Sequence, residues 1–193
     1  LKSLDFETPA KTQKFTTPSF LDDSKKLVKD LRKLSPDDIS ELMSVSSKLG
    51  ELNHERFANW HTPFTPENAK QALFAFKGDV YLGLDAERFP AADITFAQKH
   101  LRILSGLYGV LRPLDLMQPY RLEMGRKFAS GKANSLYEFW GERLTQSLND
   151  ELAQHKGKSR VLVNLASNEY FNSIKPKALD ASIITPVFKD FSG

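Results

Sequence analysis

Basic residues gather between residues 99 and 132 in a pattern that could bind phosphate. Seven basic and two acidic residues in this segment give a local charge of 7 − 2 = +5, although the whole chain carries only +3. Arg102, Arg112 and Arg121 are candidate ligands for phosphate or carboxylate, because a guanidinium can contact these groups through two hydrogen bonds. A solvated basic surface is the alternative interpretation, since charge runs usually face the solvent.

The centre of this segment is a Gly-x-x-Gly turn between Gly106 and Gly109. Glycines let a partner approach the backbone closely, and amides freed in such a turn can point at a phosphate. Because a helix is predicted just before it, over residues 96–104, the turn looks like the hairpin of a helix-hairpin-helix DNA-binding element. A tight turn that packs two elements together is the alternative.

Tyr120 and Arg121 follow this turn side by side. The tyrosine could stack on a base while the arginine binds a phosphate. A half-buried core position for Tyr120 is the alternative, and it leaves only the arginine for recognition.

Two other polar groups are candidates for catalysis. Lys77 and Asp79 flank a glycine within an apolar run. Because an isolated buried charge is costly, they must either line a solvated cleft, with acid–base or anion-binding use, or form a structural ion pair. Asn164 and Glu169 follow a predicted strand, where sites often form, although Asn and Ser also favour turns that end a strand.

The composition excludes several other kinds of chemistry. The chain has no Cys, so it has no disulfide, thiolate metal site or redox-active thiol. Its histidines lack partners at ligand spacing, and nucleotide-binding fingerprints are absent, so we expect neither a metal nor a cofactor. No run approaches the ~20 apolar residues of a membrane span, so we expect no membrane partner.

The elements that must position these residues combine helices with few strands. The periodicity predicts α+β architecture in one domain over residues 1–193, with an extended arm over 1–23. Residues 79–84 fit either a helix or a strand. Helices are predicted over 24–34, 35–50, 65–75, 96–104 and 135–153, and strands over 160–166, as a buried strand, and 182–188.

Five runs of this sequence together resemble the bacterial peroxide stress protein YaaA family. The resemblance implies a cytoplasmic protein that helps bacteria survive hydrogen peroxide, with less free iron and less DNA damage. It also implies a β-rich core wrapped by helices, a helix-hairpin-helix-like element and a basic cleft that binds DNA. The runs, in the family's order, are residues 76–81, 104–115, 119–124, 136–140 and 164–171.

Family members also open with a short apolar strand and continue past the position of Gly193 with a strand and a basic helix. We therefore expect the chain to lack both segments.

The leading hypothesis is a DNA-binding protein that limits iron-dependent oxidative damage. An enzyme acting on a small anionic or nucleotide-like substrate in the same cleft is the alternative, with Lys77, Asp79 and Glu169 as its polar groups. Direct iron sequestration is disfavoured, because ligand clusters are missing. The residues expected to contact DNA are Lys77, Arg102, Gly106, Gly109, Arg112, Tyr120 and Arg121.

Overall fold

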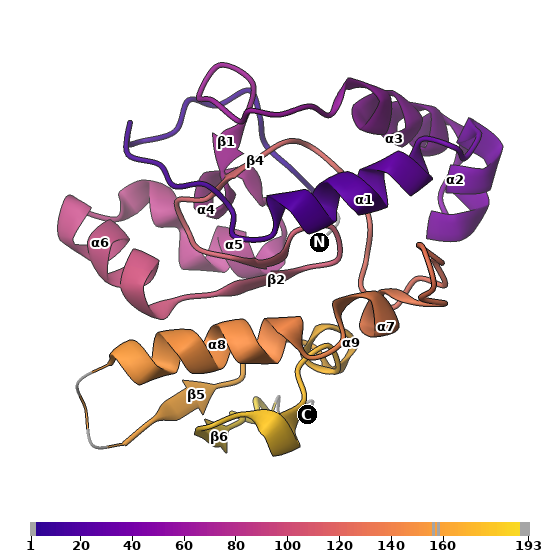
Figure 1. Cartoon of the computed structure of the whole chain (residues 1–193). Helices are drawn as coiled ribbons and strands as arrows, with labels where there is room; N and C mark the ends of the chain where they lie inside the picture. Colours follow the sequence, from indigo (N-terminus) through magenta and orange to yellow (C-terminus); the bar gives the residue numbers. More distant parts are fainter. Residues whose placement is uncertain (1–2, 156, 158, 190–193) are drawn as a thin grey trace.

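The computed structural model describes residues 3–155, 157 and 159–189. Helices make up 43% and strands 12% of the structure, which confirms the α+β class. The strands contain only two or three residues each and pair into three two-stranded sheets. The expected β-rich core is therefore wrong for the described residues, because helices and loops supply most of the buried side chains. Figure 1 shows helices α1 to α6 around the small sheets β1–β4 and β2–β3, with α7 to α9 and the sheet β5–β6 below them.

The predicted first helix is confirmed, whereas the predicted second helix is two helices. Ser35 caps α2 as expected, because its Oγ accepts from the Asp38 amide at 3.2 Å while the Asp38 carboxylate accepts from the Ser35 amide at 2.8 Å. Ser44 then ends α2 in a left-handed conformation with φ of 51°. Gly50, expected as a stop, lies inside α3. The bounds are α1 Leu21–Leu31, α2 Pro36–Met43 and α3 Ser47–Asn59.

The middle of the chain contains short elements that periodicity resolves poorly. Only the last four residues of the helix predicted over 65–75 are helical, and the helix predicted over 96–104 lies several residues earlier. The ambiguous residues 79–84 are helical. The bounds are β1 Lys70–Gln71, α4 Ala72–Ala75, α5 Asp79–Leu84, η1 Ala86–Arg88, α6 Ala91–His100, β2 Ile103–Ser105, β3 Gly109–Leu111 and β4 Leu116–Met117.

The last part of the chain places a long helix over a parallel strand pair (Figure 1). The helix predicted over 135–153 breaks at Gly141, whose φ is 54°. The strand predicted as buried is not, because Val161 and Val163 are 43% and 52% exposed. The bounds are α7 Leu136–Trp140, α8 Arg143–Gln154, β5 Val161–Val163, α9 Asn168–Phe171, η2 Pro176–Ala178 and β6 Ser182–Ile184.

Residues 3–20 form the expected extended arm on the surface of the fold. Leu4 forms an antiparallel bridge with Phe76, and Thr16 forms a parallel bridge with Asp115. The Asp115 carboxylate also accepts from the Thr16 hydroxyl at 2.6 Å. Through these bridges the arm is attached to two residues, Phe76 and Asp115, that lie much later in the sequence. Among the described residues, no helix combines the length and apolar character needed to cross a bilayer.

Candidate functional site

The glycine turn is part of the core. It joins β2 to β3, so the hairpin connects two strands and the helix-hairpin-helix expectation is wrong here. Gly106 accepts a hydrogen bond from Trp140 Nε1 at 3.0 Å, and a Cβ on Gly106 would lie 2.2 Å from the Leu122 carbonyl oxygen. Gly109 has φ of 71° and packs against Trp140 and Leu144. Both glycines are buried, which agrees with the alternative interpretation that the turn packs two elements together.

Two of the predicted DNA-binding arginines are neutralised inside the protein. Arg112 lies 2.8 Å from Asp115, whose carboxylate is 1% exposed. Arg102 pairs with Glu151 and donates to the Gln98 carbonyl at 3.0 Å. The first pair lies within the loop that follows β3, and the second joins the end of α6 to α8, so both guanidinium groups are already paired with carboxylates.

Lys77 forms an ion pair, but its partner is Asp5 of the arm and not Asp79 as in the alternative interpretation. Its Nζ lies 2.8 Å from the Asp5 carboxylate, and Lys70 Nζ lies 3.8 Å from the same group. The hydrogen bond from Lys77 holds the pKa of Asp5 well below its ordinary value, and burial lowers the pKa of Lys70. Asp79 is exposed at the start of α5.

The carboxylate of Glu169 accepts from the Gly125 amide at 2.9 Å. Asn164 accepts from the Ala166 amide at 3.0 Å, as expected for a turn that ends a strand. Among the described residues, no hydrogen bond or ion pair joins any two of Lys77, Asp79 and Glu169. The structure therefore does not assemble the predicted catalytic group.

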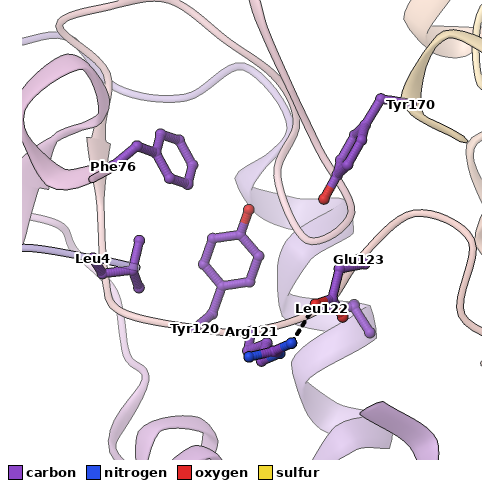
Figure 2. A pocket seen from close by; sticks show the side chains of 7 residues that line it. All are labelled: Leu4, Phe76, Tyr120, Arg121, Leu122, Glu123 and Tyr170. Carbon is purple, nitrogen blue, oxygen red and sulfur yellow. Dashed lines mark ion pairs between the residues drawn. The ribbon is translucent and has the colours of Figure 1, made fainter. Parts of the chain in front are cut away.

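Four segments that are distant in the sequence instead meet at one small pocket (Figure 2). They are the arm, the end of α4, the loop after β4 and helix α9. The free volume is about 10 Å³, room for about one water molecule. The pocket is lined by Leu4, Phe76, Tyr120, Arg121, Leu122, Glu123 and Tyr170.

The charged centre of this pocket is a carboxylate between two guanidinium groups. Glu123 lies 2.9 Å from Arg121 and 3.1 Å from Arg126. Arg126 does not line the pocket, so the charges of the lining residues Arg121 and Glu123 sum to zero. Arg121 Nε is buried and has no hydrogen-bond acceptor among the described residues. A buried donor without an acceptor is costly, so this N–H needs a water or a ligand oxygen.

Neutral tyrosines complete the pocket. Figure 2 shows the hydroxyl groups of Tyr120 and Tyr170 pointing into the same space. Tyr120 is bonded to Ser105 Oγ at 2.6 Å, so it takes the buried position that was its alternative interpretation. Burial raises the pKa of Tyr120, Tyr170 and Tyr81, so these phenols stay neutral at physiological pH.

Sequence reasoning identified Arg121 and Tyr120 but missed Glu123 and Tyr170 as members of the same pocket. The usable signal was the spacing of 121 and 123, which places a cation and an anion on the same side of an extended segment. No local signal connects Tyr170 with them.

A basic surface lies beside this pocket. We define it as Lys33, Arg126, Lys127 and Lys132, drawn from the end of α1 and the loop before α7. Asp30 holds the two parts together, because it lies 2.6 Å from Lys33 Nζ and accepts from Ser130 Oγ at 2.6 Å. Both loop lysines are exposed. Arg126 links the surface to the pocket only through its ion pair with the lining residue Glu123.

Metal ligands do not converge in the part of the chain that the structure describes. No group of three or more His, Asp or Glu side chains there could surround an ion.

The fold is mixed α+β, and motifs that are separated along the chain meet at one small pocket. The sequence profile of the peroxide stress protein YaaA family matches residues 2–193. A UPF0246 protein of Burkholderia multivorans is 58% identical over 192 residues, covering 100% of this chain and 74% of the relative. UPF0246 proteins of Burkholderia lata and Burkholderia vietnamiensis are 57% identical with the same coverage. The chain belongs to the peroxide stress protein YaaA family.

Proposed function

We propose that this chain binds DNA in the cytoplasm during peroxide stress and thereby limits iron-dependent oxidative damage to it. The observation that carries the proposal is the basic surface. Between Glu123 and Glu138 the sequence contains three basic residues and no acidic one, and the loop is fixed against α1 through Asp30. Lys127 and Lys132 are the exposed cations of this surface that have no acidic partner among the described residues, and such cations suit sequence-independent contact with the phosphate backbone.

The proposed DNA-binding residues differ from those expected from the sequence. Arg102 and Arg112 form ion pairs within the protein. Gly106 and Gly109 are buried. Lys127 and Lys132 replace them, because neither has an acidic partner among the described residues. Their long side chains can follow a phosphate backbone without a preformed groove.

The enzyme alternative gains no support, because Lys77, Asp79 and Glu169 do not form a group. DNA binding is the function that the arrangement favours.

Salt-dependent binding of duplex DNA tests the proposal. The double variant Lys127→Ala/Lys132→Ala should weaken binding, and the slope of log K against log salt should become shallower by about 1.8, since each phosphate contact contributes about 0.9. Fluorescence anisotropy at four salt concentrations measures both quantities.

The matched control is Lys99→Ala/Lys177→Ala, which removes the same charge from exposed positions on α6 and η2. It should retain the wild-type slope. Equal weakening in both double variants would reduce the effect to net charge and refute the assignment of the surface. A plasmid-nicking assay with ferrous iron and peroxide then tests protection, which the first variant should lose and the control should keep.

A further inference from the structure

One acidic side chain joins the two parts of the basic surface. Asp30, near the end of α1, is 22% exposed, and its two carboxylate oxygens have different partners. Oδ1 accepts from Lys33 Nζ of the same helix end at 2.6 Å, and Oδ2 accepts from Ser130 Oγ at 2.6 Å, 100 residues further along the chain. Across the residues that the structure describes, this is the one side-chain hydrogen bond that joins α1 to residues 127–133.

The serine end of this contact is buried. Ser130 is 6% exposed, and its hydroxyl has no other acceptor among the described residues. Without Asp30 this donor would be left unsatisfied, which costs more than the loss of a solvated hydrogen bond. The hydrogen bonds from Lys33 and Ser130 also lower the pKa of Asp30, so the carboxylate is ionised at neutral pH and acts only as an acceptor.

Ser130 closes a tight turn that contains Lys132. The Ser130 amide donates to the Ala133 carbonyl at 3.0 Å, and the Ala133 amide donates to the Ser130 carbonyl at 3.1 Å. The two residues between them are Gly131, with φ of 62°, and Lys132. Two-residue loops of hairpins need a positive φ at their first position, so the glycine suits the turn. The backbone of Lys132 is therefore held relative to Ser130, and through Ser130 relative to α1.

Lys127 is attached in a different way. Its neighbour Phe128 is 5% exposed and belongs to the hydrophobic core. Its other neighbour, Arg126, forms an ion pair with Glu123 at 3.1 Å. None of these contacts involves Asp30, so the two exposed lysines have separate attachments to the fold.

We infer that Asp30 is a positioning residue, which holds Lys132 in place for contact with a phosphate although its own charge repels DNA. This inference rests on the proposed function and deepens it, because it gives a role in DNA binding to a residue that does not touch DNA. Charge alone predicts the opposite sign, since removal of an acid beside a basic surface should tighten the binding of a polyanion. Suitable variants therefore separate the two effects.

The test uses variants that keep the wild-type net charge. Ser130→Ala removes only the hydroxyl, and Asp30→Ala/Lys33→Ala removes the carboxylate together with the cation that it pairs with. In both, duplex DNA should bind more weakly, and the slope of log K against log salt should become shallower by about 0.9, the contribution of one phosphate contact. Fluorescence anisotropy measures both quantities, and the unfolding midpoint of each variant shows that it is folded.

Two controls match these variants residue for residue. Ser173→Ala removes a buried hydroxyl that donates to the Tyr170 carbonyl at 2.7 Å. Asp22→Ala/Lys25→Ala removes an ion pair of the same spacing from the other end of α1. Both proteins should bind DNA like the wild type.

Combination with the lysine substitutions separates positioning from general destabilisation. In a Lys132→Ala protein, Ser130→Ala should leave the slope unchanged, because the side chain that it positions is gone. In a Lys127→Ala protein, Ser130→Ala should still lower the slope by about 0.9. Equal effects in both proteins overturn the inference. A loss in Asp30→Ala/Lys33→Ala that Ser130→Ala does not share assigns the effect to the charge of Lys33 and also overturns it.

Trypsin provides a measurement that does not need DNA, because it cleaves after lysine and acts fastest on loops that open easily. Cleavage after Lys132 should be faster in Ser130→Ala than in the wild type, whereas cleavage after Lys127 should be unchanged. Binding of DNA that depends on Lys132 but not on Ser130 overturns the inference and leaves the proposed function intact. Faster cleavage after Lys132 without any binding of DNA by the wild type keeps the attachment of the turn but overturns the proposed function and the role of Asp30 in it.

Discussion

The substitution Gly109→Ala separates a packing role of the glycine turn from a DNA-binding role. The left-handed backbone, with φ of 71°, costs a residue with a Cβ about 1–2 kcal/mol. The new Cβ would also lie 2.8 Å from Leu144 and 3.0 Å from Trp140, and overpacking of this kind costs about 1–3 kcal/mol. The lower entropy of the unfolded alanine chain offsets less than about 1 kcal/mol.

We therefore expect Gly109→Ala to lower the free energy of unfolding by about 3 kcal/mol. For a chain of this length, that corresponds to a fall in Tm of roughly 6–12 °C. Urea denaturation followed by circular dichroism measures the loss, and anisotropy at a temperature where the variant is folded measures its affinity for DNA. The affinity should not change, because the turn is buried.

Two other glycines serve as controls. Gly131 has φ of 62° but nothing within 4 Å of its Cβ position, so alanine there should cost only the backbone term of about 1 kcal/mol. Gly78 has neither constraint and should tolerate alanine within about 0.5 kcal/mol. Equal losses in the free energy of unfolding for Gly109→Ala and Gly131→Ala would refute the cost assigned to packing at Gly109. A folded Gly109→Ala protein with weaker DNA binding would refute the assignment of the turn to the core.

Two further predictions concern ion pairs. Arg112→Ala should lower the free energy of unfolding by about 3 kcal/mol in urea, because it leaves the buried carboxylate of Asp115 with only neutral donors; a loss below 1 kcal/mol would contradict this. Asp5→Asn should be less stable than the wild type at neutral pH, and the difference should shrink as the pH falls below the ordinary Asp value of 3.8, because the folded-state pKa lies lower. Thermal unfolding between pH 2 and pH 7 checks this, and a difference that grows on acidification would contradict it.

Local signals predicted those parts of the fold that local interactions decide. Ser35 begins a helix because its own neighbours complete the capping box, and the apolar spacing over residues 24–34 predicts α1. The same reasoning failed where a single residue in a left-handed conformation ends one helix and a second follows it, as at Ser44 and Gly141. At both positions the apolar spacing typical of a helix continues across the break, so the spacing does not reveal that the helix ends there.

The site was less predictable, because its partners are distant in sequence. Arg102 meets Glu151 only after α6 and α8 have packed, and Glu123 meets Tyr170 only at the pocket. The sequence contains the charges but does not say which are neutralised. The glycine turn was misassigned because the reason for its glycines, the indole of Trp140, lies about thirty residues further along.

The arm has a consequence for folding during synthesis. Its bridges join Leu4 to Phe76 and Thr16 to Asp115, so the bridge at Thr16 cannot form until Asp115 has left the ribosome. At about 5–20 residues per second, the intervening hundred residues take roughly 5–20 s to make. During that time the part of the arm around Thr16 lacks this attachment and is accessible to proteases and chaperones. Its docking closes the longest loop among these bridges, which makes it a late step in folding.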